Sequence, residues 1–569
     1  MLIKRLTEVS TTAALLLLWV GCDRGAVNKP SSSSPPLANS AETNFEPPLQ
    51  IATATESLNV SHEYENGELS DQFAYIESIG GGIAVLDYDG DGWDDLFFPG
   101  GGLIGKSQTI TPLPGSLFKS QQGKRFVEVT GNAQAGLASY YSNGCAAGDI
   151  NNDGFSDLLV TGYGGLQLFV NQGDGTFIES AIAAGLIDTL WSVSAGFGDL
   201  NGDGSLDFYA THNTDWSWEN NPLCNSTAGV RDICPPAAFS GLPDIIFVNN
   251  QDGTFRPVQK EAGLKPDGRG LAVMLADLNE DHKLDIYVAN DTTANFLYLN
   301  QGDATFDEIG IASGSGLDER GNPNGSMGIA IFDIDGNLLP DLWITNYENE
   351  TCALYKNDGK ANFRCVSSST GIMSLGTLFV GFGTVAGDFD LDGDQDIAIA
   401  NGHVLRFPSS NLLQQYPLLL RNSGTGKLVK QSFDPSNYFG QRWRGRGLAA
   451  CDFDKDGDLD LIFSHVRQPV AILENKTETR GSWCSIELIG THSNRNCVGS
   501  KVVFQTSKRK YMRTVVGGGS YLTQNPYTIH FGFPNTETLI DAEITWPDGK
   551  SQVFTKIEKN SPNRFIEPR

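Results

Sequence analysis

The chain has 569 residues, 40% of them hydrophobic, and a formal net charge of −28 at pH 7. This length exceeds one ordinary domain, and the acidic balance argues against a nucleic acid partner, because phosphate backbones bind basic surfaces. Sixty-five glycines separate short apolar runs, a pattern that predicts many turns and strands and few long helices.

The N-terminal region predicts export. Lys4 and Arg5 precede an apolar segment at 13–20, which is too short to span a bilayer, so residues 1–22 form an expected export signal. Gly21-Cys22 resembles the end of a bacterial lipoprotein signal, which makes Cys22 a candidate lipidation site; simple secretion is the alternative. Residues 23–48 are rich in Ser and Pro and predict a disordered tether. We therefore expect a secreted protein or a lipoprotein of the cell envelope or surface, with no other membrane contact.

A nine-residue frame, D-x-D-x-D-G-x-x-D, then recurs seven times. Side-chain oxygens at positions 1, 3 and 5 of a tight loop converge, position 9 closes the cage, and glycine at position 6 permits a sharp reversal. Hard oxygen ligands in this number suit Ca²⁺ better than Mg²⁺. The candidate ligands are Asp87, Asp89, Asp91 and Asp95; Asp149, Asn151, Asp153 and Asp157; Asp199, Asn201, Asp203 and Asp207; Asp277, Asn279, Asp281 and Asp285; Asp333, Asp335, Asn337 and Asp341; Asp388, Asp390, Asp392 and Asp396; and Asp452, Asp454, Asp456 and Asp460.

Two copies depart from the frame, since His282 and Leu338 replace the glycine of the fourth and fifth copies. The seven frames predict up to seven bound Ca²⁺ ions. Because a side chain at position 6 strains the turn, we expect the fourth and fifth sites to be weak or empty. An EF-hand is excluded because it needs a glutamate at position 12 and a helix on each side. Plain Asp/Asn/Gly turns without a metal are the alternative.

Each frame lies in a unit of four short strands. In the second unit these are expected at 143–148, 158–162, 166–171 and 176–180. Four antiparallel strands bury both faces when such sheets stack radially, which predicts a seven-bladed β-propeller over residues 49–480. The frames would join the first and second strands of the blades and lie on one rim. Small residues such as those at 146–147 would pack nearest the axis.

An insertion at 213–242 carries Trp216 and Trp218. It is either a ligand contact or a loop that caps its own blade. The cysteine content is consistent with an oxidising compartment, and Cys145 and Cys451 are expected to be buried free thiols. Local spacing suggests three disulfides, namely Cys224–Cys234, Cys352–Cys365 and Cys484–Cys497.

Residues 481–569 predict a small β domain of about six strands. Its densest basic cluster is Lys508, Arg509, Lys510 and Arg513. That cluster could dock on the acidic propeller, bind a polyanion, or simply be a solvated hairpin tip.

Several stretches carry a family resemblance. The repeats resemble the FG-GAP (VCBS) type known from integrin α heads. SNRNCVGSKV, GGGSYLTQN, IHFGF and ITWPDGKSQ in the C-terminal region resemble the ASPIC/UnbV domain, while CPPAAFSGLPDIIFVNN, YVANDTTANFLYLN and NGHV resemble the cartilage acidic protein family and its bacterial relatives. The resemblance implies a secreted calcium-binding propeller with a C-terminal β domain, and it implies no settled biochemical activity.

We expect no enzyme. The histidines lack zinc-site spacing, and no nucleophile elbow, P-loop or dinucleotide fingerprint occurs in the right context; His403 is expected to be structural. The resulting hypothesis is an exported calcium-binding propeller that mediates protein or glycan binding, or adhesion, at the cell surface. The alternatives are an extracellular polysaccharide hydrolase or lyase, with its site in the central channel or under the insertion, and a purely structural matrix component.

Overall fold

A computed structural model describes residues 49–409, 412–478 and 481–569. The predicted signal at 1–22, Cys22 and the tether at 23–48 lie outside these ranges. Within them the fold is all-β, as predicted, with one α-helix, α1 (Gly310–Ser313). In the described part of the chain, no helix has the length and apolar character needed to cross a bilayer. The 3₁₀ turns are η1 (Glu68–Ser70), η2 (Tyr75–Ser78), η3 (Pro236–Ala238), η4 (Ser367–Ser369), η5 (Ile372–Leu375) and η6 (Tyr438–Gly440).

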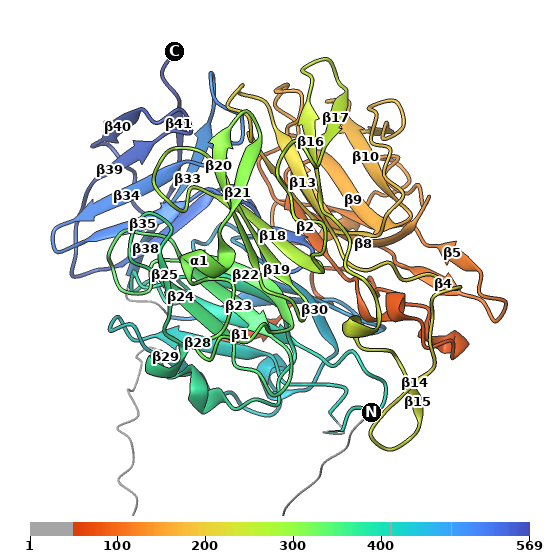
Figure 1. The fold of residues 1–569 in the computed structure, drawn as a ribbon. Helices are drawn as coiled ribbons and strands as arrows, with labels where there is room; N and C mark the ends of the chain where they lie inside the picture. Colours follow the sequence, from red (N-terminus) through yellow and green to blue (C-terminus); the bar gives the residue numbers. More distant parts are fainter. Residues whose placement is uncertain (1–48, 410–411, 479–480) are drawn as a thin grey trace, which may run out of the picture. The chain divides into compact units, whose positions relative to one another are not determined.

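Seven antiparallel sheets each contain one copy of the frame (Figure 1). In chain order their strands are β2 (Ile83–Leu86), β3 (Asp95–Phe98), β6 (Ser116–Ser120) and β7 (Phe126–Glu128); β8 (Tyr141–Gly148), β9 (Asp157–Tyr163), β10 (Gly165–Asn171) and β11 (Phe177–Glu179); β12 (Ser192–Gly198), β13 (Asp207–His212), β16 (Ile245–Asn249) and β17 (Phe255–Val258); β18 (Gly270–Ala276), β19 (Asp285–Asn290), β20 (Phe296–Gly302) and β21 (Thr305–Glu308); β22 (Ser326–Phe332), β23 (Asp341–Asn346), β24 (Ala353–Asn357) and β25 (Phe363–Cys365); β26 (Gly381–Gly387), β27 (Asp396–Asn401), β28 (Leu418–Asn422) and β29 (Leu428–Lys430); and β30 (Gly445–Cys451), β31 (Asp460–His465), β32 (Ala471–Asn475) and β1 (Ile51–Thr53). Two small hairpins, β4 (Gly102–Ile104) with β5 (Ile110–Pro112) and β14 (Cys224–Asn225) with β15 (Arg231–Asp232), extend from the first and third sheets.

The first strands of these sheets follow one another in cyclic order. Contacts run from β2 through β8, β12, β18, β22, β26 and β30, and β30 contacts β2 again. The seventh sheet is completed by β1, which pairs with β32 with Ile51 opposite Asn475. A strand from the start of the repeat region therefore joins the last sheet, which ties the two ends of the repeat region together by backbone hydrogen bonds.

The C-terminal region supplies nine strands rather than about six. They are β33 (Gly481–Ile489), β34 (Lys501–Thr506), β35 (Lys510–Thr514), β36 (Gly517–Gly518), β37 (Thr523–Gln524), β38 (Ile529–Pro534), β39 (Leu539–Thr545), β40 (Ser551–Phe554) and β41 (Pro562–Ile566). Seven of them form two sheets of their own, ordered β38-β33-β41 and β35-β34-β39-β40. The remaining two, β36 and β37, belong to sheets of the repeat region.

These two strands lie within one segment, residues 516–525, that we call the central loop. Its strand β36 pairs with β18, placing Gly518 opposite Met274, and its strand β37 pairs in parallel with β2, placing Thr523 opposite Ile83. The hydroxyl of Ser520 donates to the Leu448 carbonyl of β30 at 2.7 Å. The C-terminal region is thus hydrogen-bonded to three first strands through this one segment.

The central loop also contacts the other four first strands. The backbone N–H of Cys145 in β8 donates to Leu522 O at 3.2 Å, and the backbone of Ser520 bridges to Ile329 in β22. The N–H of Thr384 in β26 donates to Ser520 Oγ at 3.1 Å. At Gly196 in β12, a Cβ would lie 3.2 Å from the Gly517 carbonyl carbon. The absence of a side chain at Gly196 therefore makes room for this loop.

Aromatic packing closes the space around the central loop. Tyr521 is 0% exposed and packs edge-on against Phe382, with ring centroids 4.8 Å apart. Tyr521 and Leu522 share a buried cluster with Tyr75 and Ile76 of η2, in the segment between β1 and β2. Side chains of this protein therefore occupy the middle of the ring of first strands, which is one of the two places where the hydrolase or lyase alternative puts its site.

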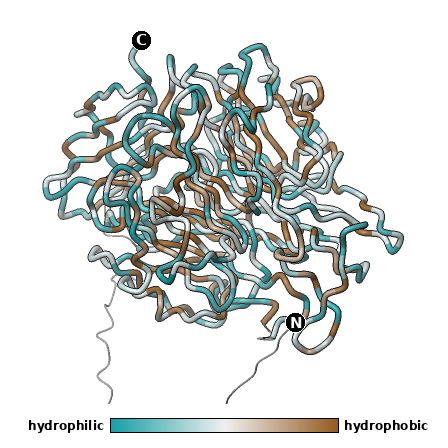
Figure 2. The backbone as a smooth tube through the Cα atoms, in the orientation of Figure 1, coloured by the Kyte–Doolittle hydropathy of each residue, from teal (hydrophilic) through white to brown (hydrophobic). Residues whose placement is uncertain are grey.

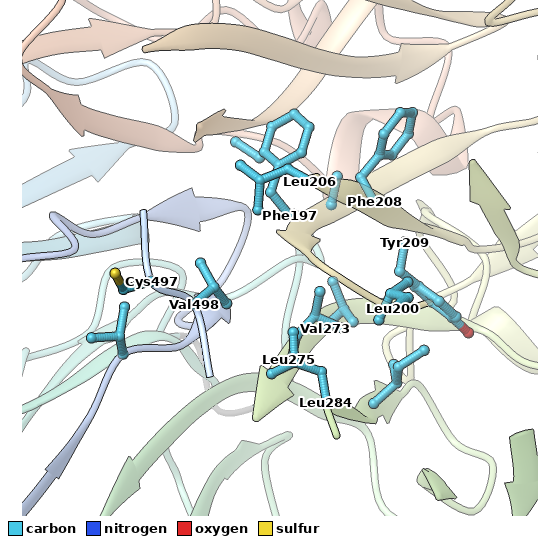
Figure 3. Close-up of a cluster of buried hydrophobic side chains, with 14 of the residues drawn as sticks. Phe197, Leu200, Leu206, Phe208, Tyr209, Val273, Leu275, Leu284, Cys497 and Val498 are labelled. Atoms are coloured by element: carbon cyan, nitrogen blue, oxygen red, sulfur yellow. The ribbon is translucent and has the colours of Figure 1, made fainter. Parts of the chain in front are cut away.

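The core is continuous between the repeat region and the C-terminal sheets. Cys497 and Val498 belong to the same buried cluster as Leu275 and Leu284, which come from the fourth repeat (Figure 3). Along the chain, hydrophobic segments coincide with the inner strands and hydrophilic segments with the outer turns (Figure 2). Burial of apolar surface thus stabilises the contact between the two regions.

Among the described cysteines, one predicted disulfide is confirmed, Cys224–Cys234, and Cys145 and Cys451 are buried free thiols as expected. The other two pairings are wrong, because Cys352, Cys365, Cys484 and Cys497 are free. In the β24–β25 hairpin, the register places Cys365 opposite Tyr355, three positions beyond Cys352. Cys484 lies opposite Phe531 on β38, while Cys497 lies in the turn before β34.

The aromatic insertion packs its first tryptophan against residues of the second and third units. Trp216 is 2% exposed, and its ring centroid lies 5.2 Å from that of Tyr163 and 6.2 Å from that of Trp191. Its indole N–H donates to Asn221 Oδ1 at 3.0 Å. Trp216 therefore packs inward between the second and third units, which is a wider contact than a cap on its own blade.

Candidate metal centres

Every frame forms a loop between the first and second strands of its sheet, and its position 9 aspartate is the first residue of the second strand. In the first loop the backbone N–H groups of Asp91 and Gly92 donate to the two Asp87 oxygens at 3.1 and 2.8 Å. The N–H of Trp93 donates to Asp91 Oδ1 at 3.0 Å. These bonds orient the carboxylates toward the centre of the loop.

Two loop positions require a left-handed backbone. Position 6 has φ of 83° at Gly92 and 65° at both His282 and Leu338. The strain expected in the fourth and fifth loops is therefore present, at a cost of about 1–2 kcal/mol per residue. Sequence reasoning missed that position 4 is left-handed as well; its residues are Gly90, Asn152, Gly202, Glu280, Gly336, Leu391 and Lys455.

The position 9 aspartate has a second role that the frame alone did not reveal. Asp95 Oδ2 accepts from the Tyr88 N–H at 3.1 Å, and its Oδ1 accepts from the Ser120 N–H at 2.7 Å. The carboxylate therefore clamps the loop to the third strand. Burial raises the pKa of Asp95 to about 9 and that of Asp157 to about 8, because the lost hydration of the charged form outweighs the backbone hydrogen bonds that the carboxylate accepts.

An asparagine at the end of the third strand extends this clamp to the preceding sheet. Asn300 Nδ2 donates at 3.0 Å both to Leu284 O in its own loop and to Leu200 O in the third loop. The same type of link to the preceding loop is made by Asn171, Asn249, Asn357 and Asn475. Asn171, Asn300 and Asn357 each begin an Asn-x-Gly turn, a pattern that indicates a hairpin and does not by itself point to the link between loops.

Within the described residues, four loops bring three carboxylates together, with one oxygen of each within 4.8 Å of the others. They are Asp87, Asp89 and Asp95; Asp333, Asp335 and Asp341; Asp388, Asp390 and Asp392; and Asp452, Asp454 and Asp460. Buried oxygens of three of these residues, Asp89 Oδ1, Asp390 Oδ1 and Asp452 Oδ1, have no hydrogen-bond partner in that part of the chain. All-oxygen sets with unused acceptors fit Ca²⁺.

The second to fourth loops are arranged differently because position 3 is an asparagine. Asn151 Nδ2 donates to Asp153 Oδ2 at 2.8 Å, and Asn201 Nδ2 donates to Asp203 Oδ2 at 2.9 Å. In the fourth loop, Asn279 Oδ1 accepts from the Asp281 N–H at 2.9 Å. The position 3 amides are thus engaged within their loops. The fifth loop, expected to be weak, is by contrast among the carboxylate clusters.

The C-terminal sheets lie against these loops. Arg509 pairs with Asp394 at 2.8 Å, and buried Arg513 donates to the Gly393 carbonyl at 3.2 Å. Two members of the basic cluster therefore dock on the sixth loop, whereas Lys508 donates to Thr536 Oγ1 within its own domain. The second loop is contacted as well, since the Asp149 N–H donates to Asn496 Oδ1 at 2.9 Å.

The seventh loop is covered by an aromatic side chain. His530 Nε2 donates to Gly457 O at 2.7 Å, and a Cβ built at Gly457 would overlap the indole of Trp483. Gly92 is the equivalent residue of the first loop, and there a Cβ would meet only Lys455 Nζ at 3.9 Å. These two glycines have the same position in the frame and different surroundings.

Gly457→Ala is therefore expected to destabilise the protein more than Gly92→Ala. Both variants place an alanine at positive φ, at about 1–2 kcal/mol, and only Gly457→Ala also displaces Trp483, at a further ~1–3 kcal/mol. Urea unfolding measures both. In a Trp483→Ala background the two effects should become equal, and a persistent difference there would contradict the contact.

His403 is buried, as the structural interpretation expected. Its Nδ1 accepts from the Leu405 N–H at 3.0 Å, and its Nε2 lies 3.4 Å from Glu348. Burial lowers the pKa of His403, so the ring is neutral near pH 7. A second buried histidine, His212, pairs with Asp188 at 2.9 Å.

Comparisons with known proteins agree with the resemblance. The ASPIC and UnbV family matches residues 490–568, and the FG-GAP-like repeat matches residues 116–210 and 277–344. Cartilage acidic protein 1 from Homo sapiens is 25% identical over 497 residues, which cover 86% of this chain and 63% of that protein. The counterpart from Xenopus tropicalis is 26% identical over 476 residues, covering 73% of this chain and 71% of that protein. The chain thus spans less than two thirds of the human relative.

A solved structure of a lectin from Agrocybe aegerita, described as recognising non-reducing terminal N-acetylglucosamine, covers 70% of this chain and 89% of its own. Its TM-score is 0.38 at 16% identity. A likeness of this degree carries no functional argument.

Proposed function

Because the chain combines FG-GAP-like repeats with a C-terminal ASPIC and UnbV domain, we propose that it is an exported, calcium-binding, seven-bladed β-propeller that binds a protein or glycan outside the cell. The observation that carries the proposal is the recurrence of oxygen-rich loops between first and second strands, four of which bring three carboxylates within 4.8 Å. When bound, calcium would neutralise these carboxylates and stiffen the loops. The side chains at positions 1, 3 and 5 would hold it, with the position 9 aspartate closing the cage.

Export is part of the proposal. The Cys224–Cys234 disulfide supports it, because such bonds persist in oxidising compartments outside the cytosol. A lipid on Cys22 would then anchor the protein at the cell envelope or surface, and without it the protein would be secreted.

The proposed activity is binding rather than catalysis. The loop aspartates already have a structural or metal-binding role, and the filled centre of the ring gives a polymer-cleaving site no support there. We infer that any ligand binds the outer surface, where calcium in the loops can order the contacting residues.

The test is a glycan array combined with a pull-down of extracellular proteins, each performed with calcium and with a chelator. A ligand should be retained with calcium and lost with the chelator. Asp454→Asn should weaken retention, whereas Asp252→Asn, on an exposed turn, should not. Retention that is indifferent to the chelator contradicts the proposal, and shortening of a glycan during the incubation would favour the hydrolase or lyase alternative.

A further inference from the structure

In three loops a basic side chain from the third strand forms an ion pair with the position 3 aspartate. Lys119 pairs with Asp89 in the first loop, and its Nζ also lies 3.1 Å from Asp91 Oδ2. Lys356 pairs with Asp335 in the fifth loop. Each ammonium is therefore bound by oxygens that a divalent ion would need as ligands.

The sixth loop carries the same arrangement with a guanidinium. Arg421 pairs with Asp390, and the two side chains are 2% and 3% exposed. Arg509 and Arg513 add further positive charge to this loop from the C-terminal sheets. Separating the two side chains would leave a buried charge without its partner. The ion pair between Arg421 and Asp390 is therefore costly to break.

In six of the seven loops, the identity of one third-strand residue varies together with the identity of the residue at position 3. It is the residue before the serine or asparagine of the third-strand clamp. Where position 3 is aspartate it is Lys119, Lys356 or Arg421; where position 3 is asparagine, in the second to fourth loops, it is Val170, Val248 or Leu299. An internal cation is thus present where the extra carboxylate is present.

The seventh loop departs from this correlation. Position 3 is Asp454, yet the third-strand residue is Glu474, and aspartates also occupy positions 452, 456, 458 and 460. Two basic side chains close to this loop in sequence are engaged with other groups: Lys455 donates to Gly92 O, and Lys476 pairs with Glu474 at 2.8 Å. Asp452 Oδ1 is buried without a hydrogen-bond partner in the described part of the chain.

We infer that Lys119, Lys356 and Arg421 are internal counter-cations that close the first, fifth and sixth loops to divalent ions, and that the seventh loop is the high-affinity calcium site. A calcium ion entering the closed loops must first displace a paired cation, whereas in the seventh loop the third-strand residue, Glu474, places no cation on Asp454 and pairs with Lys476 instead. The inference rests on the proposed calcium binding and assigns it to particular loops.

The experiment counts tight calcium sites on the full exported chain by equilibrium dialysis and calorimetry. Asp454→Asn should weaken the tightest site at least tenfold, because one unit charge is removed beside the ion. Asp89→Asn should leave that site unchanged. Lys119→Met and Lys356→Met should each add one bound calcium, and Lys430→Met, outside the loops, should add none. Circular dichroism melts verify that each variant is folded.

Three results would overturn the assignment. Loss of the tightest site in Asp89→Asn but not in Asp454→Asn would place it in the first loop, with the proposed function intact. An unchanged calcium count in both folded lysine variants would show that the lysines do not close their loops. Absence of calcium binding in the unmodified chain and in every variant would overturn the proposed function together with the inference.

Discussion

Tyr521→Ala is expected to lower the free energy of unfolding by about 3–5 kcal/mol, the range for truncating a large buried aromatic side chain. Tyr521 is 0% exposed and lies on the central loop, which contacts all seven first strands. Those strands hold one another in cyclic order and have little freedom to collapse onto a cavity. Urea unfolding monitored by circular dichroism measures the loss.

Two variants control this experiment. Tyr521→Phe keeps the ring and removes only the hydroxyl, so the change should stay below about 1.5 kcal/mol. Tyr416→Ala removes a ring that is 38% exposed, and its effect should be clearly smaller than that of Tyr521→Ala. If Tyr521→Ala and Tyr521→Phe unfold at the same urea concentration, the central loop does not stabilise the ring of sheets.

The calcium-free protein is expected to lose stability as the pH rises from about 4 toward 8. Burial raises the pKa of Asp95 to about 9, that of Asp207 to about 8 and that of Asp341 to about 7, against about 3.9 in the unfolded chain. Below pH 4 both states hold these protons. Above it the unfolded chain releases them while the folded protein keeps them, so unfolding becomes more favourable until the folded pKa is passed.

Calcium should remove the share of this dependence that comes from the seventh loop, where burial raises the pKa of Asp452 to about 8, because a bound cation favours the ionised carboxylates. At a concentration one hundred times its dissociation constant, each site adds about 2.7 kcal/mol of stability. Denaturation at pH 5 and pH 8, with calcium and after its removal, tests both statements. The raised pKa of His212 causes a loss of stability with rising pH that calcium leaves unchanged. The quantity to compare is therefore the difference in stability between the protein with calcium and the protein without it. Equal stability in the two series at pH 8 would contradict the prediction.

Local sequence was sufficient for the repeats and their loops. A frame of nine residues encodes its own turn, since the hydrogen bonds that shape it, such as Gly92 N–H to Asp87, join residues five positions apart. The strand periodicity on either side then predicts an all-β fold. The Cys224–Cys234 disulfide was predictable for the same reason, because it closes a separation of only ten residues. A similar closeness in sequence was misleading for Cys352 and Cys365, where the strand register decides which side chains face each other.

The amino-acid sequence by itself determined the all-β class, the seven oxygen-rich loops and their place between strands, because each depends on residues that are neighbours along the chain. Only the tertiary structure decided that residues 516–525 fill the middle of the ring, as in the bond from Thr384 to Ser520 across 136 positions. It also decided that Lys119 forms an ion pair with Asp89, and that Asn300 links two loops by hydrogen bonds. Such contacts depend on how sheets pack against one another, and no local pattern names the partner that packing brings into reach.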